Sequence, residues 1–175
     1  MHNIVICGDT GKRKLTETIV NICSKNGGVL VCDRGKLYET CENPRFFIVT
    51  DVAESFCQSI VVLGEDVGDI EIKNEFAVIV EGENMRGLEI LKNQGCKNVL
   101  TCSMNGKATL NISSVYPQKI INLQRNIKTL DGKMTEPCEF KISCEEDEIY
   151  PVFPPPIPTK LFPLLIPIFD ELLIP

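Results

Sequence analysis

Five short apolar runs recur through the first half of the chain, and they constrain its fold more than any other feature. They occupy residues 4–7, 29–32, 46–49, 60–63 and 76–80. Within each run, polar and apolar residues do not alternate. Strands that are buried on both faces have this pattern, so the runs predict a mainly parallel sheet covered by helices.

Two helical patterns lie between and after these runs. The first has apolar residues at helical spacing, namely Leu15, Ile19, Ile22 and Cys23. It ends at the glycine pair at 27 and 28, where left-handed backbone is easiest. The second pattern begins at the N-cap Asn84, ends at Gly95 and has three apolar residues on one side, namely Met85, Leu88 and Leu91. The segment 36–41 also permits a short helical piece before Pro44.

The second half of the chain changes period. From Thr109 onward apolar residues alternate with polar ones, at Leu110 and Ile112, then Ile121, Leu123 and Ile127, then Cys138, Phe140 and Ile142. The pairs Asn105-Gly106 and Asp131-Gly132 are typical of hairpin turns, so this part predicts an antiparallel meander. The predicted fold class is therefore α/β, with three layers, a mainly parallel sheet and an antiparallel C-terminal part.

Residues 145–175 differ from the α/β domain predicted for 1–144. We expect the acidic run at 145–148 to form a solvated hinge. The following tail from Tyr150 to Pro175 holds eight of the eleven prolines among many apolar residues. Proline at this density prevents a regular helix, and the apolar stretches are shorter than the roughly 20 residues of a membrane span. We expect the tail to dock in extended form on its own domain or on a swapped neighbour; the alternative is the groove of a partner protein.

The charge of the chain limits which partners it can bind, and its N-terminal residues bear on its location. The net charge is −6, and no basic block is longer than residues 12–14. A nucleic-acid backbone requires a broad positive surface, so nucleic acid is excluded as the main partner. No cationic segment followed by an apolar one and a cleavage site appears at Met1, so we expect a cytoplasmic location.

The cysteines predict thiols and not a metal centre. There are nine, an odd number, and Cys7 and Cys32 lie within apolar runs, which is typical of reduced core residues. Structural zinc sites use pairs two to four residues apart, whereas Cys96 and Cys102 are six apart. With His2 as the one histidine, we expect neither zinc nor haem, and no catalysis that relies on a histidine base.

The turn after the first apolar run has the composition of a phosphate site. Its residues are Gly8, Asp9, Thr10, Gly11, Lys12 and Arg13. A helix N-terminus carries about half a positive charge, and the three consecutive cations at 12–14 lie at the N-terminus of the predicted helix. Because these positive charges repel one another, the arrangement favours a bound anion. We predict that these six residues hold a phosphate group. The alternative is an ordinary strand-to-helix turn with its cations in solvent.

Acidic residues end the later strands. They are Asp33, Asp51, Glu65 and Glu81. Parallel strands would bring them to the edge of the sheet where Lys12 lies, and a magnesium nucleotide favours this mixture of cation and carboxylates. We assign Glu81 as the candidate magnesium ligand. The alternative is that Glu81 and Glu83 favour the N-terminus of the following helix.

A family resemblance extends from these residues. The turn Gly8-Asp9-Thr10-Gly11-Lys12 after a strand resembles the Gly-Thr-Asn-Gly-Lys-Thr-Thr loop of the Mur ligase ATP-binding domain. Residues 77–142, which include Gln124-Arg125 and Leu130-Asp131-Gly132, resemble small Mur-ligase-like proteins of Firmicutes bacteria. The resemblance covers residues 3–143 and implies ATP binding with Lys12 at the phosphates. Arg13 and Lys14 replace both threonines, and the chain is too short for the other two ligase domains, so it does not imply ligase activity.

Two functions follow from the sequence. The first is a degenerate P-loop-type domain that binds a nucleotide, such as ATP with magnesium, or another phosphate. The second is a non-catalytic scaffold whose proline-rich tail joins copies of the chain or partner proteins.

Overall fold

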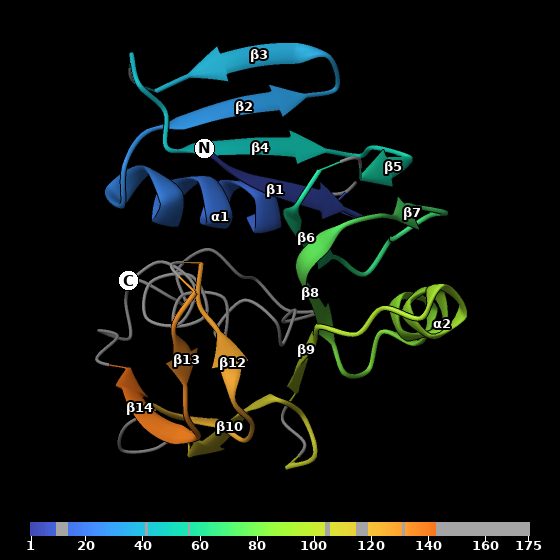
Figure 1. The fold of residues 1–175 in the computed structure, drawn as a ribbon, viewed down its shortest axis with the longest axis vertical. Helices are drawn as coiled ribbons and strands as arrows, with labels where there is room; N and C mark the ends of the chain where they lie inside the picture. The colour runs from blue at the N-terminus through green and yellow to red at the C-terminus, as the bar shows by residue number, and fades with distance from the viewer. Residues whose placement is uncertain are drawn as a thin grey trace. The chain divides into compact units, whose positions relative to one another are not determined.

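The computed structural model describes residues 1–9, 14–40, 42–55, 57–103, 106–114, 119–130 and 132–142. The chain forms two compact units, Met1–Leu100 and Thr101–Pro175. The described residues form a mixed α/β fold with two helices, in which strands predominate (Figure 1). The predicted boundary at 144/145 and the proline-rich tail lie outside the described residues.

Six strands of the first unit are hydrogen-bonded in the order β8-β6-β1-β4-β2-β3. They are β1 (His2–Cys7), β2 (Val29–Asp33), β3 (Lys36–Glu39), β4 (Phe46–Thr50), β6 (Ser59–Leu63) and β8 (Glu75–Glu81). Every neighbouring pair in this order is parallel except β2 and β3. The five apolar runs are the five parallel strands, which confirms the mainly parallel sheet for this unit.

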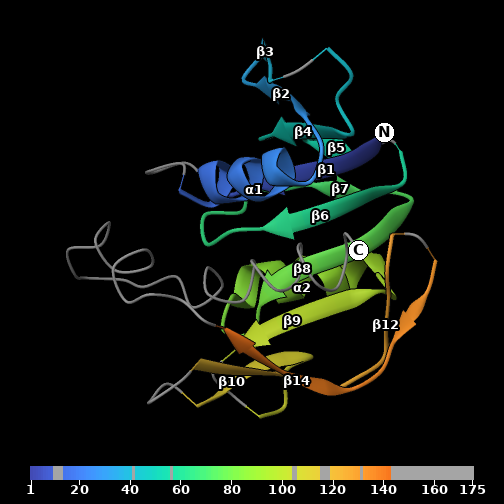
Figure 2. The ribbon, with the colours of Figure 1, turned by 90° about the vertical axis from the view of Figure 1, so that its left-hand side faces the viewer.

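Helix α1 (Lys14–Lys25) follows β1, and helix α2 (Met85–Gln94) follows β8. The two helices lie on opposite faces of this part of the sheet (Figure 2). The four apolar residues predicted to form the inner side of α1 are all buried. The predicted helix is therefore confirmed.

The ends of α2 are also as predicted, but the three apolar residues predicted on one side of it are not equally buried. Asn84 is the N-cap and accepts a hydrogen bond from the Gly87 amide, and Gly95 ends the helix in the left-handed conformation. Of the three apolar residues predicted on one side of the helix, Leu91 is buried and Leu88 is partly buried, whereas Met85 is 76% exposed. Ile90 is buried on the inner side of the helix instead.

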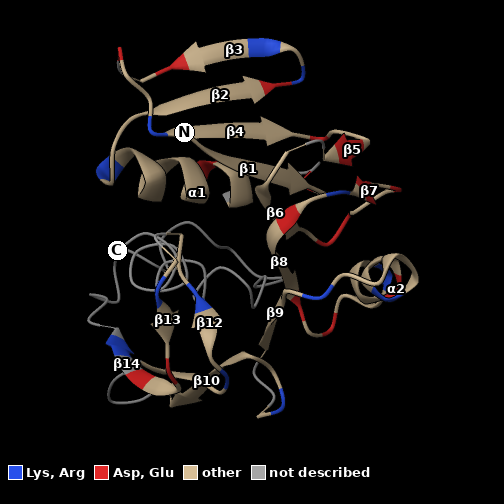
Figure 3. Cartoon of the chain, in the orientation of Figure 1, with Lys and Arg blue, Asp and Glu red and all other residues tan. Residues whose placement is uncertain are grey.

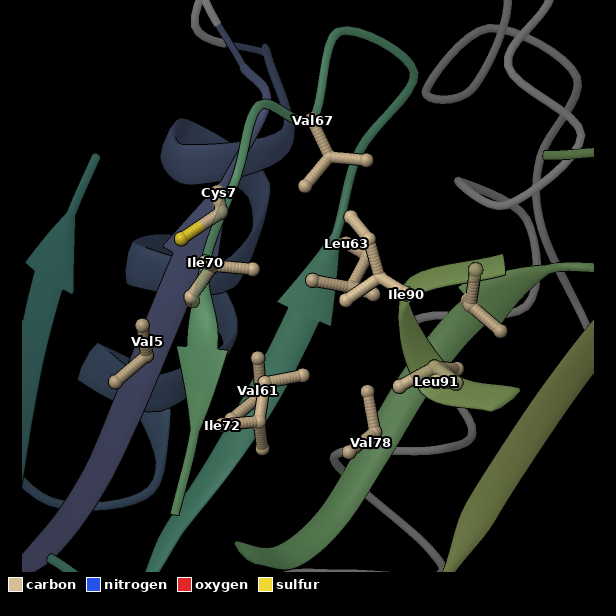
Figure 4. Packing of buried hydrophobic residues seen from close by; sticks show 11 residues of the cluster. Val5, Cys7, Val61, Leu63, Val67, Ile70, Ile72, Val78, Ile90 and Leu91 are labelled. Carbon is tan, nitrogen blue, oxygen red and sulfur yellow. The ribbon is translucent and has the colours of Figure 1, made fainter. Parts of the chain in front are cut away.

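A hydrophobic cluster fills the space between the sheet and α2 (Figure 4). The strands contribute Val5, Cys7, Val61, Leu63, Val78 and Val80, and α2 contributes Ile90 and Leu91. Successive strand residues face opposite sides of a sheet, so Ile4 and Ile6 of β1 face the α1 side, where both are fully buried. Burial on both faces explains why the runs show no alternation.

The segment 36–41 does not contain the helical piece that the sequence permits. Residues Lys36–Glu39 form β3, which pairs antiparallel with β2. The turn between them is formed by Arg34 and Gly35, which both have positive φ, at 47° and 77°. Two such residues between paired strands form the tight turn that matches strand twist, and this turn excludes a helix start.

Two very short strands lie in the loops after β4 and β6. They are β5 (Glu54–Ser55) and β7 (Glu71–Ile72), and they pair in parallel. Lys73 forms ion pairs with Glu54 and Glu71 beside them.

Four strands, the first of which in the chain begins two residues before the second unit, are hydrogen-bonded in the order β14-β11-β10-β9. They are β9 (Val99–Ser103), β10 (Leu110–Ser114), β11 (Lys119–Leu123) and β14 (Cys138–Ile142), and a separate antiparallel pair comprises β12 (Ile127–Lys128) and β13 (Met134–Thr135). β11 is antiparallel to both β10 and β14, which confirms the meander. β12 and β13 flank the predicted turn at 131–132, so that hairpin is confirmed as well.

The predicted hairpin at Asn105-Gly106 is wrong. β9 and β10 are parallel, with Cys102 beside Leu110. The chain returns to Thr101, in the middle of β9, before β10 begins, and hydrogen bonds between Thr101 and Thr109 fix that return.

Within the described residues, no helix combines the length and apolar character needed to cross a membrane.

Candidate phosphate-binding site at the carboxyl end of β1

The parallel strands of the first unit bring the predicted acidic residues to one edge. β1, β2, β4, β6 and β8 run in the same direction. Asp33 ends β2, Asp51 follows β4, Glu65 follows β6 and Glu81 ends β8. Figure 3 shows acidic residues at the ends of β2 and β4. The prediction that these acids share the carboxyl edge is confirmed, whereas Lys12 lies outside the described residues.

The strand order also places a change of direction beside β1. From β1 the chain passes through α1 to β2 and β4 on one side, and then crosses to β6 and β8 on the other. In open parallel sheets, ligands bind outside the carboxyl ends of the strands at such a switch point. Here that point lies between β1 and β6, where Gly8 follows one strand and Gly64 follows the other.

Gly8 begins the turn after β1 in a conformation that favours glycine. Its φ is +86°, and a Cβ at this position would lie 2.4 Å from the Val67 nitrogen. A Cβ on Gly64 would lie 2.5 Å from the Gly8 carbonyl oxygen. The same oxygen accepts a hydrogen bond from the Asp66 amide at 3.2 Å. The two loops therefore approach so closely that each requires a glycine.

Asp9 caps the first turn of α1. Its Oδ2 accepts hydrogen bonds from both the amide and the hydroxyl of Thr16, each at 2.8 Å. A carboxylate at a helix N-terminus interacts favourably with the positive end of the helix. The chain itself thus supplies one negative group where the sequence predicts a bound anion.

Four of the six predicted phosphate-binding residues, Thr10, Gly11, Lys12 and Arg13, lie outside the described residues. Their roles remain predictions. Gly8 and Asp9 are described, and both belong to the turn at the carboxyl end of β1.

Asn84 connects the carboxyl end of β8 to that of β6. Its Oδ1 accepts from the Gly87 amide at 2.9 Å, while its Nδ2 donates to the Gly64 carbonyl at 2.7 Å. Gly64 in turn contacts Gly8, so one side chain fixes the ends of three neighbouring strands. An N-cap is readable from sequence, but the second contact of Asn84 spans 20 residues and has no local signal.

On the other side of β1, the carboxylates of Asp33 and Asp51 contact side chains at the same carboxyl edge of the sheet. Asp33 accepts a hydrogen bond from the Thr50 hydroxyl at 2.7 Å. Asp51 has a positive φ of 53° and lies 3.8 Å from the guanidinium of Arg34. These contacts tie the ends of β2 and β4 together.

The Cys7 thiol beneath this edge is not a candidate nucleophile. Burial raises its pKa to about 11, and the negative charge of Asp51 acts in the same direction. Its sulfur donates weakly to the Val52 carbonyl at 3.6 Å. Since the thiolate is the reactive form, Cys7 is inert at neutral pH.

Glu81, the predicted magnesium ligand, is 8% exposed at the end of β8. Among the described residues, no group of three or more histidine, cysteine, aspartate or glutamate side chains is arranged to hold a metal ion. Magnesium usually retains several waters and binds one or two carboxylates together with substrate phosphates. Glu81 fits that role only as a single ligand to an ion that a nucleotide brings.

No protein-family model and no curated protein matches the chain.

Proposed function

We propose that this protein binds the phosphate group of a nucleotide, or another phosphate, at the turn that follows β1. The observation that carries the proposal is topological. β1 lies inside a parallel sheet at the point where the chain changes sides, and the turn at its carboxyl end leads directly into α1. This is where open α/β sheets bind ligands, and a helix N-terminus is where they bind phosphate.

The Mur-ligase-like turn supplies the groups for this role. Gly8 provides the positive φ with which the turn begins. From the sequence, the amides of 10–13 and the side chains of Lys12 and Arg13 would contact the phosphate oxygens. Asp9 already satisfies the amide of Thr16. The proposal therefore assigns the anion to the amides that precede Thr16.

We propose that the nucleotide binds together with a magnesium ion. Glu81 is the residue we assign to it, and a metal-bound nucleotide would also offset the repulsion between phosphate and the acidic edge. A magnesium nucleotide should therefore bind more tightly than the free nucleotide. We propose binding alone, without ligase activity.

The test is thermal unfolding of the full chain with ATP, GTP or inorganic phosphate, each with and without magnesium. A ligand at 100 times its Kd adds about 2.7 kcal/mol of stability. For a chain of this size, that energy raises the Tm by roughly 5–10 °C. Lys12→Ala should remove this rise.

Lys25→Ala is the matched control, because Lys25 is an exposed lysine in the last turn of the same helix. It removes the same charge at the opposite end and should retain the rise in Tm. If no phosphate ligand raises the Tm of the wild-type chain, or if both variants lose the rise equally, the proposed site is wrong.

A further inference from the structure

The outer edge of the sheet in the first unit is formed by β3, the last strand in the hydrogen-bonded order. All four of its residues are exposed. Leu37 and Tyr38, which point to opposite faces, are 65% and 53% exposed. An edge strand with apolar side chains on both faces is a surface to which an extended segment can add.

The direction of the free backbone groups follows from the β2–β3 pairing. Lys36 pairs with Asp33 across the two-residue turn, and the Thr40 amide donates to the Val29 carbonyl at 2.9 Å. Backbone groups alternate in direction along a strand, so those of Lys36, Tyr38 and Thr40 face β2. The N–H and C=O groups of Leu37 and Glu39 therefore face away from the sheet.

One segment of the chain has the sequence of a strand that can pair on one side only. Between residues 159 and 173, proline occurs at 163 and 167 and nowhere else. Both numbers are odd, so in an extended backbone both proline nitrogens lie on the same side. The N–H groups of Phe162, Leu164 and Ile166 lie on the other side. Proline is tolerated in a strand in this arrangement, with its nitrogen facing away from the neighbouring strand.

We propose that residues 161–168 of a second copy of this chain bind along β3 and extend the sheet by one strand. Even-numbered residues of that segment would bond to Leu37 and Glu39, and its apolar side chains would cover Leu37 and Tyr38. The two side chains that this strand would cover are exposed in the single chain, so the edge is open to a segment of a second copy.

Charge and length fit this occupant. Residues 161–168 carry no charge, so they place no like charge opposite Lys36 or Glu39. The 18 residues between Ile142 and this segment span up to about 60 Å when extended. The acidic run at 145–148 within that connection would favour contact with water. The β3 edge is separate from the proposed phosphate site, so a negative result for one proposal does not affect the other.

The test uses two proline substitutions in the full chain. Leu164→Pro removes an N–H that is aimed at β3, whereas Leu165→Pro removes one that is aimed away from it. The two variants have the same composition. Amide hydrogen exchange by NMR is measured at Leu37 and Glu39, and light scattering gives the mass over a range of protein concentration.

In the wild-type chain and in Leu165→Pro, exchange at Leu37 and Glu39 should slow at least tenfold as concentration rises, with a mass approaching that of a dimer. In Leu164→Pro these amides should exchange fast at every concentration and the mass should stay that of one chain. Equal behaviour of the two variants overturns the pairing. Slow exchange that does not depend on concentration overturns the second copy, because the segment would then bind the edge of its own chain.

Discussion

Replacing Gly8 by alanine tests the close approach of the loops at the carboxyl edge. At Gly8 a Cβ would lie within 3 Å of three backbone atoms of the Asp66–Val67 segment, in a residue whose φ is +86°. The positive φ alone costs an L-residue about 1 kcal/mol. Backbone atoms move less readily than side chains, and overpacking of this kind costs about 1–3 kcal/mol. We therefore expect Gly8→Ala to lower the free energy of unfolding by about 3 kcal/mol.

Gly35→Ala separates the two contributions. Gly35 has a similar φ of +77°, but a Cβ there meets nothing within 4 Å, so this variant should lose about 1 kcal/mol. Gly64→Ala has the contact without the positive φ and should lose about 1–3 kcal/mol. Urea unfolding with linear extrapolation measures all three. The reasoning is refuted if Gly8→Ala and Gly35→Ala differ by less than about 0.5 kcal/mol, the scatter of unrelated surface changes.

Three further predictions concern the same edge. Cys7 has a folded pKa of about 11 against an ordinary 9.0, so its stabilising effect is complete below pH 9 and is lost as the pH rises towards 11. Over this pH range the free energy of unfolding, measured by urea titration, should fall by about 2–3 kcal/mol less in Cys7→Ala than in the wild-type chain. If the two free energies fall in parallel with pH, the prediction is wrong. Asn84→Ala removes a cap and leaves the Gly64 carbonyl without its donor, so it should cost about 2 kcal/mol, whereas Asn93→Ala on the exposed side of α2 should cost under 0.5. Asp9→Ala should cost about 1 kcal/mol in the same assay, and an unchanged stability would mean that the Thr16 contact does not cap α1.

The strands and helices of the first unit could be predicted because each has a local signal. The runs at 4–7 and 76–80 are apolar without interruption, and α1 and α2 end at glycines that adopt positive φ. β3 could not be found in this way, because Leu37 and Tyr38 are adjacent apolar residues that suit a short helix equally well. The turn Arg34-Gly35 decides between the two structures, since both residues adopt positive φ.

The error at Asn105-Gly106 has a different cause. Asn-Gly is the strongest short signal for a hairpin, but it reports on the turn and not on the partner of the next strand. The Thr101 and Thr109 hydroxyls bond to each other's backbone amides and hold the chain in a tight return, so β10 lies parallel to β9. Such a return depends on two side chains eight residues apart, and no periodicity marks them.

Asp9 changes the electrostatics of the proposed phosphate site. Three consecutive cations at a helix N-terminus favour a nearby anion, and from the sequence we predict that this anion is a bound phosphate. In the structure the Asp9 carboxylate binds the Thr16 amide and hydroxyl, so part of the positive end of α1 is already neutralised. A phosphate must then bind beside a carboxylate, and the repulsion is smallest when a cation accompanies it. Asp9→Asn, which keeps an acceptor oxygen without the charge, should therefore strengthen the binding of free phosphate and reduce its dependence on magnesium. Titration by calorimetry with and without magnesium measures both effects, and weaker binding of phosphate by Asp9→Asn would show that the carboxylate supports the site and does not compete with the ligand.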